Sequence, residues 1–184
     1  MLFQNPDLQL IEETVEKELK SGPANLKMKK AAAALSAVSV SEKLALSPFL
    51  HVPPFALSKG QRLRVALGAI LTMGPGILLM DEPTTGQNRK NIERLLQVIR
   101  HDSEIKAVIF CSHDMDTVCR FADRVILLKD GRIIAQGKPG EIVIQTDLLR
   151  ETGLAPTFPV RLSLRTGITP PALTCEDFLR GAGR

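Results

Sequence analysis

Two neighbouring carboxylates follow a short apolar run in this chain. Residues 77–80 (ILLM) have the composition of a buried strand, and Asp81 and Glu82 come directly after them. The carboxyl ends of such strands are where open α/β sheets bind ligands. One carboxylate there can hold a hydrated Mg²⁺ ion, and the next can orient or deprotonate a water molecule. The pair therefore predicts metal-assisted phosphate chemistry.

A second loop that could handle phosphate lies upstream, at residues 57–61 (LSKGQ). Ser58 and Gln61 have the spacing of a capping box, in which Ser58 accepts from the amide of Gln61 and Gln61 reaches back. A helix start of this kind carries unpaired amides and partial positive charge, which suit an anion. Gly60 removes a side chain where a phosphate could approach the backbone. Either feature alone is common, but the two joined by one helix favour a phosphate site.

Composition excludes several other classes of protein. The chain has 184 residues, enough for one modest domain or one domain plus an appendage. Its net charge of +4 comes from mixed basic and acidic residues, and its aromatic residues are seven Phe, so no nucleic-acid partner is expected. Cys111, Cys119 and Cys175 lack a C-x-x-C spacing, which suits a reducing cytosol rather than a disulfide scaffold or a zinc site. Neither a signal peptide nor an apolar run of about 20 residues is evident.

The elements that must position these residues follow from periodicity and turn signals. Helices are expected at residues 11–20, 27–38, 41–46, 58–73, 88–101 and 115–122. Gly22 and Pro23 are expected to end the first helix. Strands are expected at residues 77–80 and 107–111, and a hairpin at 124–129 and 132–135 around the turn at 129–131 (KDG).

The motifs resemble those of the ATP-binding cassette (ABC) family. LSKGQ resembles its signature loop, usually LSGGQ, and ILLMDE resembles its Walker B strand with the catalytic glutamate. Residues 3–10 (FQNPDLQL) resemble the Q-loop, and are particularly similar to that of energy-coupling factor importers. His113 follows the strand at 107–111, about thirty residues after Glu82, and resembles the switch histidine of the family. Asn88 stands where the D-loop usually has aspartate, which puts coupling between the two nucleotide sites of the family in doubt.

The resemblance implies a role for each of these residues. Glu82 would polarise the attacking water, and His113 would hold that water and the γ-phosphate. Asp81 and Gln4 would hold Mg²⁺, with Gln4 also facing a membrane partner.

The signature loop implies partners as well. In the family, two cassettes face head to tail, so Ser58, Gly60 and Gln61 would close on ATP held by a second ABC subunit. The parent protein would be an ATPase at the cytoplasmic face of the cell membrane. It would work with an integral membrane transporter subunit that imports a metal ion or a vitamin.

The chain lacks one family motif. No G-x-x-x-x-G-K-[ST] P-loop is found; residues 74–76 (GPG) are not followed by Lys and Ser. The fold expected is therefore α/β, a partial P-loop NTPase (ABC ATPase) fold. It would contain a helical subdomain, the second half of a mostly parallel sheet and an antiparallel hairpin. Residues 1–145 would form the carboxyl-terminal two-thirds of a cassette, and residues 146–184 a small extension similar to that of energy-coupling factor ATPases.

Two other functional hypotheses remain open. The chain could be a non-catalytic module that donates only its signature loop to a partner owning a P-loop. A chromosome or DNA-repair ATPase carries the same signature but is less favoured, because the chain shows no coiled-coil heptads. For the chain alone, without a P-loop, no ATP hydrolysis is expected.

Overall fold

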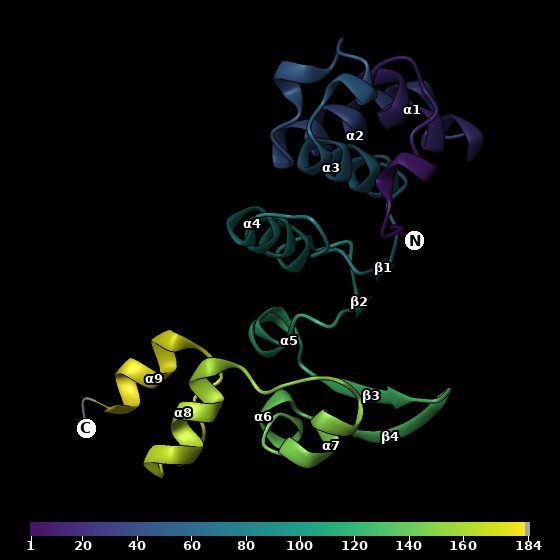
Figure 1. Cartoon of the computed structure of the whole chain (residues 1–184). Coiled ribbons are helices and arrows are strands. Elements are labelled where there is room, and N and C mark those ends of the chain that lie inside the picture. Colours follow the sequence, from purple (N-terminus) through teal and green to yellow (C-terminus); the bar gives the residue numbers. More distant parts are fainter. Residues whose placement is uncertain (183–184) are drawn as a thin grey trace. The chain divides into compact units, whose positions relative to one another are not determined.

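A computed structural model describes residues 1–182, and Figure 1 shows its helices and strands. The chain divides into two compact units, Met1–Cys111 and Ser112–Arg184. The predicted boundary after residue 145 is based on the resemblance to the family, whereas these units are defined by compactness. The predicted boundary therefore stays a prediction. Gly183 and Arg184, at the end of the predicted extension, lie outside the described residues. Within residues 1–182, no helix is both long and apolar enough to cross a membrane.

Three helices form the core of the first unit: α1 (Val15–Asn25), α2 (Lys30–Lys43) and α3 (Lys59–Leu71). Short 3-10 turns flank them: η1 (Pro6–Leu8), η2 (Ser47–Phe49) and η3 (Pro54–Ala56). Leu19 and Leu67 are fully buried, and a Cβ placed on Gly68 would lie 2.7 Å from a methyl carbon of Leu19. Gly68 therefore lets α1 and α3 approach closely. Burying one such leucine contributes about 1.5–3 kcal/mol.

The predicted first helix is displaced. It begins at Val15 rather than residue 11, because Thr14 caps it and the Glu18 carboxylate accepts the amides of Ile11 and Glu12 at 2.9 and 2.8 Å. It also continues through Pro23 to Asn25, so the predicted break was wrong. A proline this close to the end removes few helix bonds. The expected helices at 27–38 and 41–46 were wrong in their bounds, because α2 runs from Lys30 to Lys43 without a break.

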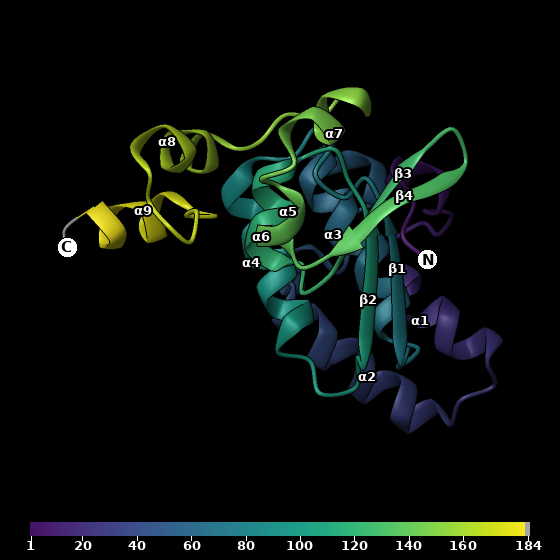
Figure 2. The same cartoon turned by 90° about the horizontal axis from the view of Figure 1, so that it is seen from below.

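The sheet of the first unit is parallel, as predicted. Strand β1 (Ile77–Asp81) pairs with β2 (Ala107–Cys111), with Ile77 opposite Ala107 and Asp81 opposite Cys111. The two strands lie side by side in Figure 2. Helix α4 (Arg89–Arg100) connects them and buries one apolar face: Ile92, Leu95, Leu96 and Ile99. The α/β fold class is therefore correct.

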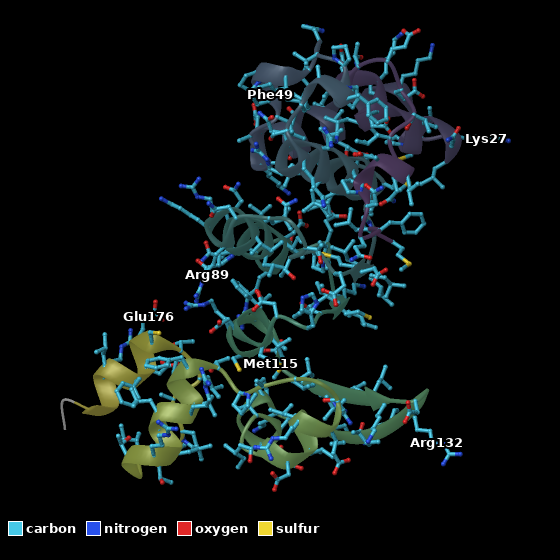
Figure 3. The ribbon with its side chains drawn as sticks, viewed as in Figure 1. Lys27, Phe49, Arg89, Met115, Arg132 and Glu176 are labelled. Carbon is cyan, nitrogen blue, oxygen red and sulfur yellow. The ribbon has the colours of Figure 1, made fainter. Side chains whose placement is uncertain are left out.

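The second unit contains the predicted hairpin. Strands β3 (Val125–Lys129) and β4 (Arg132–Gly137) pair antiparallel. Asp130 and Gly131, at the turn, have φ of +48° and +74°, as a two-residue hairpin turn with two left-handed positions requires. The side chain of Arg132 projects outward beside this turn in Figure 3.

Five helices accompany the hairpin within the described residues. They are α5 (Met115–Phe121), α6 (Pro139–Ile142), α7 (Thr146–Glu151), α8 (Phe158–Thr166) and α9 (Cys175–Ala182). Buried apolar side chains from α5, β3 and the segments that follow form one cluster: Met115, Cys119, Leu127, Ile142, Val143, Leu149 and Val160. The residues after β4 thus share a core with α5 and the hairpin.

Cys119 provides a direct test of this core. Burial, reinforced by the negative charges of Asp116 and Asp114, raises the pKa of its thiol to about 11 from 9.0. The thiol stays protonated up to that pH, so at pH 8 the reactive thiolate is about a hundredfold scarcer than at an unshifted site. We expect iodoacetamide at pH 8 to modify the exposed Cys111 and Cys175 and to spare Cys119. Peptide mass spectrometry would show this, and urea should remove the difference. Equal rates in the folded chain would contradict the buried position.

Candidate functional site

Gln4 follows an isolated bridge beside β1, and Asp81 ends β1, at the same edge of the sheet. The amide of Leu2 donates to the carbonyl of Leu79 at 2.7 Å, and the amide of Asp81 donates to the carbonyl of Leu2 at 2.9 Å. Leu2 therefore forms a parallel bridge beside β1. Parallel strands present their carboxyl ends at one edge, where ligands of α/β sheets bind. The sequence placed Asp81 at such an edge, but the pairing that brings Gln4 there is visible only in the structure.

Glu82 has a backbone conformation that the sequence did not indicate. Its φ is +43°, in the left-handed region that a residue with a side chain seldom occupies. Its amide donates to the carbonyl of Cys111 at 3.0 Å, so the end of β2 holds the turn in place. Conformations of this kind cost about 1–3 kcal/mol and cluster at functional sites, where the surrounding structure maintains them. The backbone of Glu82 is thus held just beyond β1, and its side chain is half-buried.

The capping box at the start of α3 is confirmed. The Ser58 amide donates to Oε1 of Gln61 at 2.8 Å, and the Gln61 amide donates to Oγ of Ser58 at 3.4 Å. Ser58 and Gln61 therefore satisfy one another. Within residues 1–182, the amides of Lys59 and Gly60 at the first turn find no acceptor. They add to the positive end of the helix dipole, which favours an anion.

Residues 57–61, the predicted signature loop, lie against the turn that follows Glu82. A Cβ built on Gly60 would lie 2.9 Å from Oε1 of Gln87, and one built on Gly86 would lie 2.8 Å from Nζ of Lys59. Gly86 has φ of +68°, so the turn also needs glycine for its conformation. The helix start and the turn after the two acids thus form one surface within the first unit. Sequence spacing alone gave no sign of this contact.

The donor atoms at this edge suit a hard cation. Asp81, Glu82 and Gln4 offer carboxylate and amide oxygens, which are ligands that Mg²⁺ accepts. Across residues 1–182, no group of three or more His, Cys, Asp or Glu side chains could hold a metal by itself. Mg²⁺ usually takes one or two carboxylates and completes its shell with phosphate and water. Thr85 also carries a buried Oγ1 that no group in the described chain hydrogen-bonds. The residues present therefore fit a metal–phosphate ligand that supplies the missing contacts.

His113 belongs to the second unit. It is exposed and lies two residues after the end of β2. The next residue, Asp114, caps α5 by accepting the Asp116 amide at 3.1 Å and the Thr117 hydroxyl at 2.6 Å. Capping of α5 thus explains the position of Asp114. The role predicted for His113 stays a prediction.

Comparison with known proteins decides the family. The family model for the ABC transporter matches residues 1–85, from the bridge at Leu2 to the turn after Glu82. The energy-coupling factor transporter ATP-binding protein EcfA2 of Staphylococcus aureus is 38% identical over 189 residues, which cover 97% of this chain and 66% of that protein. The chain belongs to the ABC transporter ATP-binding family.

Solved cassette structures agree with the fold. CbiO1 of Clostridium perfringens, part of the ABC transporter complex CbiONQ, superimposes with a TM-score of 0.72 at 28% identity, covering 91% of this chain and 66% of that one. The ATP-binding cassette MJ0796, a dimer bound to ADP and Pi, gives 0.64 at 29% identity, covering 75% and 61%. The chain therefore spans less than two thirds of these cassettes. It spans 26–30% of four longer Methanosarcina relatives.

Asn88, at the predicted D-loop position where the family usually has aspartate, has a local task in the structure. Oδ1 of Asn88 accepts the Lys90 amide at 2.9 Å and caps α4. Asparagine and aspartate are about equally good helix caps. An asparagine at this position therefore caps the start of α4 without the negative charge that an aspartate would carry.

Proposed function

We propose that this chain is the signature and Walker B portion of an ATP-hydrolysing subunit of an energy-coupling factor type importer. The observation that carries the proposal is the shared surface of the first unit, where the capped start of α3 contacts the turn after Glu82. EcfA2, which is named as an energy-coupling factor transporter protein, and CbiO1, which is part of the transporter complex CbiONQ, support this choice among ABC proteins.

Each residue would have a positioning task in hydrolysis. The Glu82 carboxylate would orient the attacking water, and the exposed His113 would hold that water and the γ-phosphate. Asp81 and Gln4 would hold Mg²⁺, which when bound neutralises phosphate charge. Phosphoryl transfer requires mainly this positioning and charge neutralisation.

The signature loop would act on ATP bound by a second ABC subunit, as in head-to-tail dimers of the family. Ser58 and Gln61 would keep the first turn of α3 in shape, and Gly60 would let phosphate approach the amides. Gln4, in an exposed turn, would face the membrane transporter subunit at the cytoplasmic face of the membrane. The cargo would be a metal ion or a vitamin.

The sheet of the first unit supports a further part of the proposal, that a P-loop half completes the fold. Ile77, Leu79 and Ile109, which the strand register places on one face of the sheet, are 63%, 40% and 59% exposed. Parallel sheets are normally covered on both faces. The phosphate-binding half of a cassette, whose P-loop is not found in the printed sequence, would cover this apolar face.

The chain by itself should hydrolyse no ATP and bind it poorly, because the P-loop supplies most phosphate contacts. Isothermal titration calorimetry with Mg²⁺ and ATP on the 184-residue chain checks this. Saturable binding in the low micromolar range would overturn this part of the proposal. An in-frame P-loop in the DNA upstream of Met1 would favour the enzyme, and its absence would favour a module that only donates its signature loop.

A further inference from the structure

One ion pair joins the turn after Gln4 to the signature helix. Asp7 lies in η1 and Arg62 is the fourth residue of α3. Nε of Arg62 donates to Oδ1 of Asp7 at 2.6 Å, and Nη2 donates to Oδ2 at 3.4 Å. This two-point contact is geometrically specific, unlike that of a single ammonium group.

The same guanidinium also holds the residue before the capping box. Nη1 of Arg62 donates to the carbonyl of Leu57 at 2.6 Å, immediately ahead of Ser58. The Arg62 side chain is 19% exposed and that of Asp7 is 36% exposed, so water screens the contacts only in part. Arg62 therefore connects the Q-loop turn and the start of the signature loop through one rigid planar group.

The Q-loop segment is itself braced, so a displacement of Gln4 should reach Asp7. Oδ1 of Asn5 accepts the Asp7 amide at 3.2 Å. Oε1 of Gln9 accepts the Phe3 amide at 2.7 Å, and Nε2 of Gln9 donates to the Met1 carbonyl at 2.9 Å. These bonds close residues 1–9 into one small unit around Gln4.

Helix stability does not explain why an arginine stands at position 62. A cation in the first turns of a helix opposes the helix dipole. Asp7 offsets that cost from outside the helix, and the third contact, to Leu57, adds nothing to hydrogen bonding within α3. We propose that Arg62 is a positioning residue whose contacts with Asp7 and Leu57 transmit the state of the Gln4 turn to the Ser58 capping box. The ligands assigned to the Gln4 turn and to the Ser58 capping box rest on the proposed function. The mechanical link between these two loops does not depend on it.

Amide hydrogen exchange on this chain tests the link without any nucleotide. Asp7→Asn should accelerate exchange of the Ser58 and Gln61 amides by about three- to tenfold, the range expected for a partly screened charged hydrogen bond. The amide of Leu67, deeper in α3, should be unchanged, which separates a local link from general destabilisation. Asp7→Glu should restore slow exchange.

Asp102→Asn is the matched control. It breaks an ion pair of the same unit, Lys43 with Asp102 at 2.8 Å, that touches neither loop. It should leave exchange at Ser58 and Gln61 unchanged.

A double-mutant cycle completes the test. Arg62→Met should accelerate exchange at Ser58 at least as much as Asp7→Asn, because it removes the Leu57 contact as well as the Asp7 contact. The double variant should match Arg62→Met, because Asp7→Asn has nothing further to remove once Arg62 is gone. Additive effects, or acceleration confined to residues 5–9, would overturn the proposal. If Arg62→Met does not fold, Asp7→Asn and Asp7→Glu still decide it. Failure of ATP hydrolysis in a complete cassette would count against the proposed function and leave the exchange result standing.

Discussion

Glu82→Gln in a complete cassette should lower ATP turnover by about 10²–10⁴-fold while ATP still binds. The glutamine keeps the size of the side chain and its hydrogen-bonding capacity, but it loses the charge that orients and polarises water. The backbone should not move, because the 3.0 Å bond from the amide of Glu82 to the carbonyl of Cys111 uses no side-chain atom of residue 82. Steady-state kcat and an ATP-binding isotherm on the same preparation measure the two effects separately.

The matched control for this substitution is Glu42→Gln. Glu42 is an exposed carboxylate on α2 in the same unit, far from β1 in sequence. Its replacement removes one negative charge from the protein and should leave kcat unchanged. Unchanged turnover in Glu82→Gln would mean that another group serves as the catalytic carboxylate.

Local signals predicted the elements of the site well. The capping box is set by residues three apart, and the strand before Asp81 by four consecutive apolar residues. Both depend on near neighbours in the chain, so spacing was sufficient to find them. The hairpin turn at Asp130 and Gly131 belongs to the same class.

Errors arose where distant residues decide the outcome. Glu18, only 3% exposed, accepts amides from Ile11 and Glu12 and so moves the start of α1. No periodicity of residues 11–20 contains that information. Pro23 remains helical next to Gly22, where a Cβ would lie 2.8 Å from Met73 of the loop after α3. Packing against that loop thus opposes the break that Gly and Pro predict from sequence alone.

The candidate site likewise combines features set by near neighbours in the chain with features set by distant residues. Sequence identified Ser58, Gly60 and Glu82 individually, but not the contact between Gly60 and Gln87 or the left-handed backbone of Glu82. Both depend on tertiary contacts: the packing of the start of α3 on the turn after Glu82, and the bond from the Glu82 amide to β2. The candidate surface is therefore defined by how two locally predictable loops meet.

Gly60→Asp should abolish hydrolysis in a complete homodimer, by at least about 10²-fold, because it places a carboxylate where phosphate would approach the first-turn amides. Folding should be preserved for two reasons. An acidic residue in the first turn of α3 is favourable to the helix dipole. The atom that a new Cβ meets, Oε1 of Gln87 at 2.9 Å, is the end of a flexible side chain that can move aside.

Gly60→Ala separates the two effects of the aspartate. Alanine meets the same Gln87 oxygen but brings no charge, so the alanine variant should retain most activity if electrostatic repulsion dominates. If both variants lose the same amount of activity, the defect instead arises because the new side chain keeps phosphate from approaching the backbone. Circular dichroism and urea unfolding should show all three proteins folded.

Mixed dimers would establish that Gly60 acts on the nucleotide of the partner subunit. One subunit carries Gly60→Asp and the other carries a disabled P-loop lysine, while homodimers of either variant should be inactive. In a head-to-tail dimer, the signature loop of the first subunit faces the P-loop of the second. Both lesions then fall in one composite site and leave the other intact, so the mixture should regain part of its hydrolysis. Full activity of the Gly60→Asp homodimer would exclude a role in phosphate binding and reduce Ser58 and Gln61 to an ordinary helix cap.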